Sequence, residues 1–239
     1  MSAVSTLAGL ASVELGAHNM ALPPAFILPF DAATFHEQDF TRYGIARPPS
    51  IVRSVTKRQA EYLAGRRAAL AALREAGNHA TDLPIHADRS PAWPAGFIGS
   101  LSHARNLAVA VAMRMNAGVT CVGIDIEELI ASDQIPSVRN MAVTCGECEH
   151  LAALANLKGW PYALTVAFST KESFYKATAS TIGRIFDFRT LQIVYCDPIE
   201  ARLEAEIVDT LAPALLAGQR YTLCWIEVRP DVLLTSCAW

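Results

Sequence analysis

Two acidic residues inside a short apolar segment are the first feature of this sequence that can do chemistry. The segment reads Gly-Ile-Asp-Ile-Glu over residues 123–127. On a strand, Asp125 and Glu127 project from one face, about 6.6 Å apart along the chain, while the isoleucines point to the other face. Carboxylates this close disfavour joint ionisation unless a cation compensates, and Mg²⁺ prefers oxygen donors. The pattern indicates a metal site; the competing interpretation is that both acids end an exposed edge strand.

A second charged pair lies in residues 168–177, which read Phe-Ser-Thr-Lys-Glu-Ser-Phe-Tyr-Lys-Ala. On a helix, Glu172 and Lys176 share one face because they are four residues apart, and an ordinary surface ion pair would explain them. The aromatic residues around them make the helix largely apolar, so we expect the narrow charged stripe to face a cleft. Lys171 points about 100° away from Glu172 on such a helix.

The segment at residues 99–105, Gly-Ser-Leu-Ser-His-Ala-Arg, offers groups that bind anions. A glycine-containing turn that presents Ser102, His103 and Arg105 can grip phosphate oxygens through charge-assisted hydrogen bonds. The competing interpretations are a Ser-His nucleophilic pair and a structural histidine. Adjacent residues on a strand point in opposite directions, and the segment has no Gly-x-Ser-x-Gly elbow, which disfavours the hydrolase.

Two further groups of residues have simpler explanations. One is a basic face of an expected helix, usually solvated, from which one or two residues reach an anion: Lys57, Arg58, Arg66 and Arg67. The other is Cys145, Cys148 and His150, whose spacing is that of zinc ligands but which lack a second Cys/His pair at a matching distance. The six cysteines are scattered, mostly in apolar runs, which is typical of reduced, buried thiols in a cytoplasmic protein.

Hydrophobic periodicity predicts the elements that position these residues. Apolar residues at helical spacing predict helices over residues 56–76, 147–157 and 161–179. Apolar and alternating runs predict strands over residues 97–102, 107–113, 119–127, 190–195, 202–208 and 221–228. Residues 1–49 contain several prolines, and we expect them to wrap the surface without regular structure.

The composition is that of a folded protein, with 52% hydrophobic and 18% charged residues among 239. The element order predicts an α+β fold of two halves, residues 1–118 and 119–239. The first half is net basic and the second net acidic, which suits an anionic ligand and a metal respectively, although chance surface variation explains the imbalance equally well. A basic run with interleaved aromatics, a secretory signal and a bilayer-length apolar run are all missing. We therefore expect a cytoplasmic protein that neither binds nucleic acid nor inserts stably into membranes.

Five segments, taken together and in order, resemble the Sfp-type 4′-phosphopantetheinyl transferases, especially the group that contains enterobactin synthase component D. They are residues 59–66, 93–96, 99–103, 123–127 and 168–176. Gly-Ile-Asp-x-Glu followed about forty residues later by Phe/Trp-Ser-x-Lys-Glu-Ser-x-x-Lys is far more specific than either piece alone. The resemblance covers most of the chain. It implies a monomer of two similar α+β halves related by a pseudo-twofold axis, with coenzyme A bound between them.

The resemblance also implies a role for the acids and for one lysine. Asp125, Glu127 and Glu172 match the family's Mg²⁺ ligands, and Lys176 matches its pyrophosphate-contacting lysine. In the implied reaction, a carrier-protein serine attacks the β-phosphorus of coenzyme A and expels 3′,5′-ADP, so neutralising the pyrophosphate charge lowers the barrier. Mg²⁺ and Lys176 would supply positive charge, and Glu172 is the candidate base for the serine proton, directly or through a water.

Other residues match contacts to coenzyme A. These are Ser102 and His103 at its phosphates, with Arg58 and Arg66 near the nucleotide. Many relatives also carry a lysine just before the proline in the loop upstream of the Ser-His segment. Here Ser90 occupies that place and Arg89 precedes it, which leaves open which residue, if any, neutralises this phosphate.

The implied partners are apo carrier domains of peptide synthetases that make siderophores or other secondary metabolites, with polyketide and fatty-acid carriers as further candidates. Two other function classes would use similar residues. A metal-dependent hydrolase of phosphate esters would release phosphate without a carrier protein. A coenzyme A-binding or carrier-binding regulator without catalysis would have a broken set of acids, whereas this sequence keeps Asp125, Glu127, Glu172 and Lys176.

Overall fold

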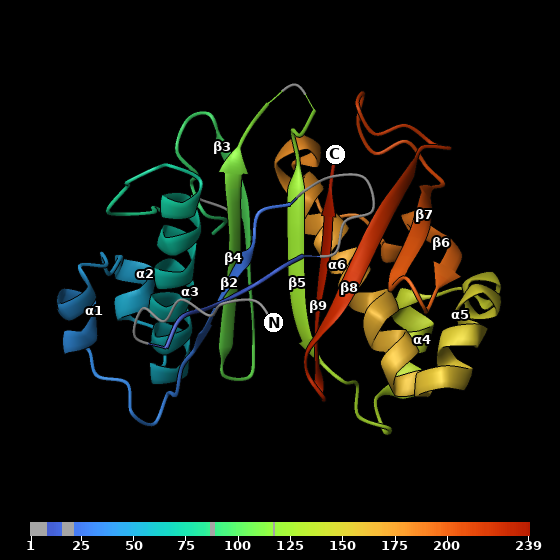
Figure 1. Ribbon diagram of the computed structural model, residues 1–239, viewed down its shortest axis with the longest axis horizontal. Helices are drawn as coiled ribbons and strands as arrows, with labels where there is room; N and C mark the ends of the chain where they lie inside the picture. The colour runs from blue at the N-terminus through green and yellow to red at the C-terminus, as the bar shows by residue number, and fades with distance from the viewer. Residues whose placement is uncertain (1–8, 16–21, 87–88, 117) are drawn as a thin grey trace. The chain divides into compact units, whose positions relative to one another are not determined.

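The computed structural model describes residues 9–15, 22–86, 89–116 and 118–239. These residues form two compact units, the first mainly within residues 22–120 and the second mainly within residues 121–239. Each unit consists of an antiparallel sheet and a long helix packed against it (Figure 1). The predicted α+β class is confirmed.

In the first unit, helix α3 (Thr56–Glu75) packs against a four-stranded sheet. The strand order is β1-β2-β4-β3, and every neighbouring pair is antiparallel. The strands are β1 (Ala11–Val13), β2 (Ala25–Pro29), β4 (Leu107–Arg114) and β3 (Phe97–Ala104). Two short helices precede α3, namely α1 (Gln38–Tyr43) and α2 (Pro49–Val52). Gly65 lets α3 approach β3 closely, since a Cβ at this position would lie 3.1 Å from Cδ1 of Leu101.

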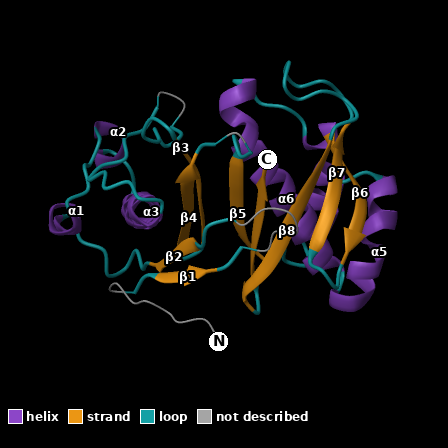
Figure 2. Cartoon of the chain, turned by 45° about the horizontal axis from the view of Figure 1, so that its top comes forward, coloured by secondary structure: helices purple, strands orange, loops and turns teal. Residues whose placement is uncertain are grey.

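In the second unit, helix α6 (Trp160–Ile182) packs against β5 (Val122–Glu128) and β9 (Val232–Ala238) of a five-stranded sheet (Figure 2). The strand order is β5-β9-β8-β7-β6, again antiparallel throughout. The remaining strands are β8 (Arg220–Arg229), β7 (Arg202–Ile207) and β6 (Leu191–Asp197). Helices α4 (Ile135–Ala142) and α5 (Cys145–Lys158) precede α6, and the short 3-10 helix η1 (Phe188–Thr190) follows it.

Local sequence signals fix where α5 and α6 begin and end. Helix α5 starts with a capping box, in which the Thr144 hydroxyl accepts from the backbone N–H of Glu147 and the Glu147 carboxylate accepts from the backbone N–H of Thr144. Gly159 separates the two helices, and Pro161 lies in the first turn of α6. Gly183, with φ of 65°, ends α6 in the left-handed conformation that glycine adopts readily. The helix that carries Glu172 and Lys176 is therefore bounded at both ends.

Most predicted helices and strands are present, with ends shifted by a few residues. The prediction that residues 1–49 are irregular is wrong for their described part, because β1, β2 and α1 lie there and β2 is an interior strand of its sheet; residues 1–8 and 16–21 lie outside the described residues. Sequence analysis also does not predict α4 or β9. Nearly every residue of β9 is buried, so the strand lacks the apolar-polar alternation that marks a half-exposed one. Across the described ranges, no helix combines the length and apolarity needed to cross a bilayer.

Gly123 on β5 is required for the contact between β5 and α6. A Cβ at this position would lie 1.9 Å from the backbone oxygen of Ser173 and 2.9 Å from the Cβ of Ala177. We expect Gly123→Ala to lower the free energy of unfolding by about 3 kcal/mol, because the backbone of α6 would have to shift to accommodate the added Cβ. Chemical denaturation would measure the loss.

Gly146 in α5 is the matched control, because a Cβ there meets no atom within 4 Å. We expect Gly146→Ala to leave stability unchanged or to raise it by up to about 1 kcal/mol, as alanine favours helix. A Gly123→Ala protein as stable as wild type would show that the close helix-strand contact is not required.

Candidate active site

Strand β5 presents Asp125 and Glu127 on one face, as the alternation predicts. Ile124 and Ile126 are fully buried on the opposite face. Asp125 pairs in register with Thr235 of β9 and is only 2% exposed, whereas Glu127 is partly buried. Strand β5 is indeed the edge strand of its sheet, but its face is covered by α6. The alternative of two solvated acids on an open edge is therefore wrong for Asp125.

Helix α6 holds the Asp125 carboxylate from two positions. The Lys176 ammonium donates to Oδ1 at 2.6 Å, and the Ser169 hydroxyl donates to Oδ2 at 2.7 Å. The Thr235 hydroxyl lies 2.9 Å from that of Ser169 and 2.6 Å from that of Ser173, so a network of hydroxyl groups joins β9 to the same helix face. Both oxygens of Asp125 are thus fixed in direction. Lys176 is 27% exposed at its side chain, so the pair is reachable by water.

The charged groups of this face interact electrostatically, as the predicted stripe requires. Burial raises the pKa of Glu127 to about 7, and the negative charges of Asp125 and Glu172 add to this rise while Lys176 opposes it. Burial also raises the pKa of Glu172, again with a contribution from Asp125. The structure therefore brings together all four residues that the sequence singled out in this half, with more negative than positive charge among them.

The donor chemistry of this face fits a Mg²⁺ ion, because three carboxylates repel one another and a hard cation prefers oxygen ligands and retains several waters. Asp125, Glu127 and Glu172 would hold such an ion. Their carboxylates are not gathered around one point: the described part of the chain contains no group of three or more His, Cys, Asp or Glu side chains in a ready metal-binding arrangement. This finding covers Cys145, Cys148 and His150 as well.

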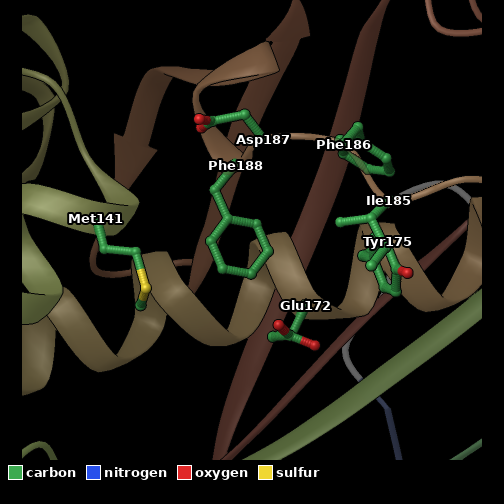
Figure 3. A pocket seen from close by; sticks show the side chains of 7 residues that line it. All are labelled: Met141, Glu172, Tyr175, Ile185, Phe186, Asp187 and Phe188. Atoms are coloured by element: carbon green, nitrogen blue, oxygen red, sulfur yellow. The ribbon is translucent and has the colours of Figure 1, made fainter.

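A pocket of about 310 Å³ opens beside Glu172 (Figure 3). Its lining is mostly apolar and comes from α4, α6 and the segment that follows α6: Met141, Glu172, Tyr175, Ile185, Phe186, Asp187 and Phe188. Figure 3 shows Glu172 below Phe188 and Tyr175 beside Ile185. The expectation that the charged stripe of α6 faces a cleft therefore holds for Glu172. Sequence analysis does not predict the pocket walls, because residues 185–188 carry no periodic pattern.

In the first unit, α3 and β3 bring Arg58 and His103 together. A guanidinium nitrogen of Arg58 lies 2.9 Å from Nε2 of His103. Because a guanidinium only donates, Nε2 accepts and the ring proton resides on Nδ1. Glu61 lies 3.5 Å from Arg58 and 3.9 Å from Nε2 of His103. The cluster therefore mixes two anion-binding groups with one competing carboxylate.

The other residues expected to contact coenzyme A have different surroundings. Ser102 is buried and points away from His103, since the segment is strand β3 followed by a hairpin and not a glycine turn. Arg105 occupies that hairpin with φ of 47°, and Arg89 is exposed with φ of 73°. Arg66 is buried with its guanidinium 4.6 Å from the centre of the Tyr62 ring, and its Nε has no hydrogen-bond partner among the described residues.

Sequence reasoning missed several residues that shape the site. Ser169, Ser173 and Thr235 were detectable only in part: two serines four residues apart mark a small hydroxyl face on α6, but nothing in the sequence pairs them with Thr235. For Lys171, the sequence predicts only that its side chain points to a different side of the helix from Glu172. It is 1% exposed and forms an ion pair of 2.6 Å with Glu147, which is equally buried.

Two family models match this chain. The family model described as 4′-phosphopantetheinyl transferase N-terminal domain matches residues 47–113, and that described as 4′-phosphopantetheinyl transferase superfamily matches residues 121–225. Enterobactin synthase component D of Escherichia coli O157:H7 is 38% identical over 208 residues, which cover 87% of this chain and 89% of the relative.

Two more relatives match over shorter regions. Enterobactin synthase component D of Salmonella typhi is 38% identical over 156 residues, 65% of this chain and 62% of the relative, so the match spans less than two thirds of that protein. The 4′-phosphopantetheinyl transferase Svp of Streptomyces mobaraensis is 30% identical over 171 residues, 71% of this chain and 66% of the relative. The resemblance stated from the sequence is confirmed, and the chain belongs to the 4′-phosphopantetheinyl transferase superfamily.

Proposed function

We propose that this protein transfers the 4′-phosphopantetheine arm of coenzyme A to a serine of an apo carrier protein and releases 3′,5′-ADP. The observation that carries the proposal is the joint placement of Asp125, Glu127, Glu172 and Lys176, which strand β5 and helix α6 bring to one face. The family membership of both halves supports it. In this reaction the serine oxygen forms a bond to the β-phosphorus, and the bond to the bridging oxygen of the pyrophosphate breaks.

The charged residues of β5 and α6 would have different roles in this reaction. Lys176 would offer positive charge to the pyrophosphate, and Asp125 holds its ammonium in place through the contact of 2.6 Å. Glu172 would accept the serine proton, directly or through a water. Asp125, Glu127 and Glu172 would hold Mg²⁺, which supplies further positive charge to the pyrophosphate when bound.

The first unit would recognise the phosphates of coenzyme A. In this proposal His103 offers its Nδ1–H, and Arg58 offers the guanidinium that lies beside it. A phosphate must displace the nearby Glu61 from these two groups, which favours a multiply charged anion over a neutral one. Arg66, Ser102 and Arg89 are proposed as further contacts; for Arg66, the buried Nε without a partner is the supporting observation.

The proposed partners are apo carrier domains of peptide synthetases for siderophores, because the relatives at 38% identity are named enterobactin synthase component D. Polyketide and fatty-acid carriers are the second class to test. We also propose that the protein acts as a monomer in the cytoplasm. The six cysteines form no disulfide with one another, as is usual in a reducing compartment.

Intact-protein mass spectrometry tests the proposed function directly. The full-length protein is mixed with coenzyme A, Mg²⁺ and an apo carrier from each of the three classes. The proposal predicts that a carrier gains one phosphopantetheine group while 3′,5′-ADP appears in equal amount. Release of phosphate from coenzyme A with unmodified carriers would instead identify a phosphate-ester hydrolase, and coenzyme A binding without turnover would identify a non-catalytic binder.

His103 offers a separate test of phosphate recognition. If His103 contacts the 3′-phosphate, wild type prefers coenzyme A over 3′-dephospho-coenzyme A. We then expect His103→Ala to reduce this preference by about tenfold, which corresponds to the loss of one charge-assisted hydrogen bond. The ratio of kcat/KM for the two substrates measures the effect. His150→Ala is the control, because His150 is exposed on α5. An unchanged ratio in a folded His103→Ala protein would assign His103 a structural role or a contact with the pyrophosphate.

A further inference from the structure

Helix α6 also carries a buried ion pair that takes no direct part in the reaction described above. The Lys171 ammonium lies 2.6 Å from Oε1 of Glu147, and both side chains are 1% exposed. Taking two charges out of water is costly, and an apolar pair of similar volume is often as stable or more stable. Stability alone would therefore not require an ion pair at this point. We therefore expect the pair to hold the elements around it in one arrangement.

The pair ties four elements to one another. Lys171 also donates to the backbone oxygen of Ala142 at 2.7 Å, which is the last residue of α4. The Glu147 carboxylate accepts from the backbone N–H of Ile193 on β6 at 2.9 Å, and from that of Thr144 at the start of α5 at 2.7 Å. Helices α4, α5 and α6 and strand β6 thus share one charged centre.

Two of these elements, α4 and α6, also form walls of the pocket beside Glu172. Met141 precedes Ala142 at the end of α4, and Glu172 follows Lys171 on α6. The third wall includes Phe188 of η1, and η1 packs against both α4 and β6. The α4 and α6 walls are therefore next to residues of the ion-pair network, and the η1 wall packs against two of the elements that the network joins. We expect a change in the pair to move Glu172 relative to Met141, since each is the chain neighbour of a residue in the network.

We propose that Lys171 and Glu147 are positioning residues, which set the location of Glu172 and the shape of its pocket without touching coenzyme A or the carrier. This inference rests on the proposed function, because it assigns the pair to the same reaction. Each polar side-chain atom of the pair has at least one hydrogen-bond or ion-pair partner, and satisfied buried polar networks specify one structure. Misplacing a reacting group by about 1 Å can cost on the order of 10²-fold in rate.

The test is the double variant Lys171→Met/Glu147→Gln in the full-length protein. It leaves no buried charge unpaired, and the glutamine oxygen can still accept from the backbone N–H of Ile193. We expect a folded protein in which kcat for carrier loading falls by at least about tenfold while KM for coenzyme A stays within about threefold, the signature of lost positioning and not of lost binding. The control is Lys158→Met/Glu227→Gln, which removes an exposed ion pair of 2.8 Å from the same unit and should leave both constants unchanged.

Each outcome of this experiment has a defined meaning. A folded double variant with kcat within about twofold of wild type would overturn the positioning role, and so would a raised KM for coenzyme A with normal kcat. Failure of the double variant to fold would also overturn it, since the pair would then serve the fold as a whole. If wild type itself loads no carrier, the proposed function fails, which is a result distinct from all of these.

Discussion

Asp125→Asn is expected to lower kcat/KM for carrier loading by about 10³-fold while the protein remains folded. Asparagine has the shape of aspartate and can still accept from the Ser169 hydroxyl, which lies 2.7 Å from Oδ2. It lacks the charge that holds the Lys176 ammonium at 2.6 Å and that would bind a divalent cation. The variant thus removes the electrostatic function of the residue and keeps most of its packing. Mass spectrometry of the carrier over time measures the rate, and circular dichroism checks the fold.

Two controls make this result specific. Asp197→Asn alters an aspartate of the same unit that only accepts local hydrogen bonds, chiefly from Ile199 and Glu200, and it should load carriers at the wild-type rate. Excess EDTA with the wild-type protein should abolish loading, and added Mg²⁺ should restore it. Full activity in EDTA, or in Asp125→Asn, would contradict the assignment of this residue to a metal-dependent reaction.

Alanine is a poorer choice at this position, which the structure explains. From the sequence, an acid on a site-facing surface is expected to tolerate Asp125→Ala with little loss of fold. Asp125 is instead 2% exposed and hydrogen bonded to Lys176 and Ser169. Removing its carboxylate would leave both partners without it and would cost roughly 1–3 kcal/mol for each hydrogen-bonding group left unsatisfied. Activity and stability would fall together and could not be separated.

The sequence predicts well those features that depend on neighbours along the chain. Residues 123–127 alternate, so Asp125 and Glu127 had to share a face once the segment formed a strand. Residues 172 and 176 had to share a face of a helix for the same reason. Capping residues around Thr144 and Gly183 mark the ends of α5 and α6.

The features that the sequence does not predict depend on partners far away along the chain. Strand β9 joins β5 in a register that brings Thr235 opposite Asp125, 110 residues earlier. No local pattern in a single sequence encodes this pairing. The Lys171–Glu147 pair joins two helices, and Lys171 alone looks like an ordinary charged residue on α6. Burial is a property of the assembled unit, so no local sequence pattern indicates that this lysine lies in the interior.

Lys176→Ala should reduce kcat/KM for carrier loading by about 10²-fold, and this loss should exceed that of Lys171→Ala measured at a temperature where both variants are folded. The two lysines belong to one helix, yet Lys176 reaches Asp125 from a side chain that is 27% exposed, whereas Lys171 is enclosed with Glu147. Truncating Lys171 leaves a buried carboxylate unpaired, so its main effect should be a loss of about 3–5 kcal/mol of stability.

Comparing the two lysine variants distinguishes the effect of removing a charge beside the reacting groups from the effect of removing a charge buried in the core. Thermal unfolding and initial loading rates, measured on both variants, give one stability value and one rate for each lysine. Lys176→Ala should show the larger loss of rate and Lys171→Ala the larger loss of stability. Equal rate losses at matched folded fractions would contradict the prediction, because the charge of Lys176 beside Asp125 would then contribute no more to the rate than the buried Lys171.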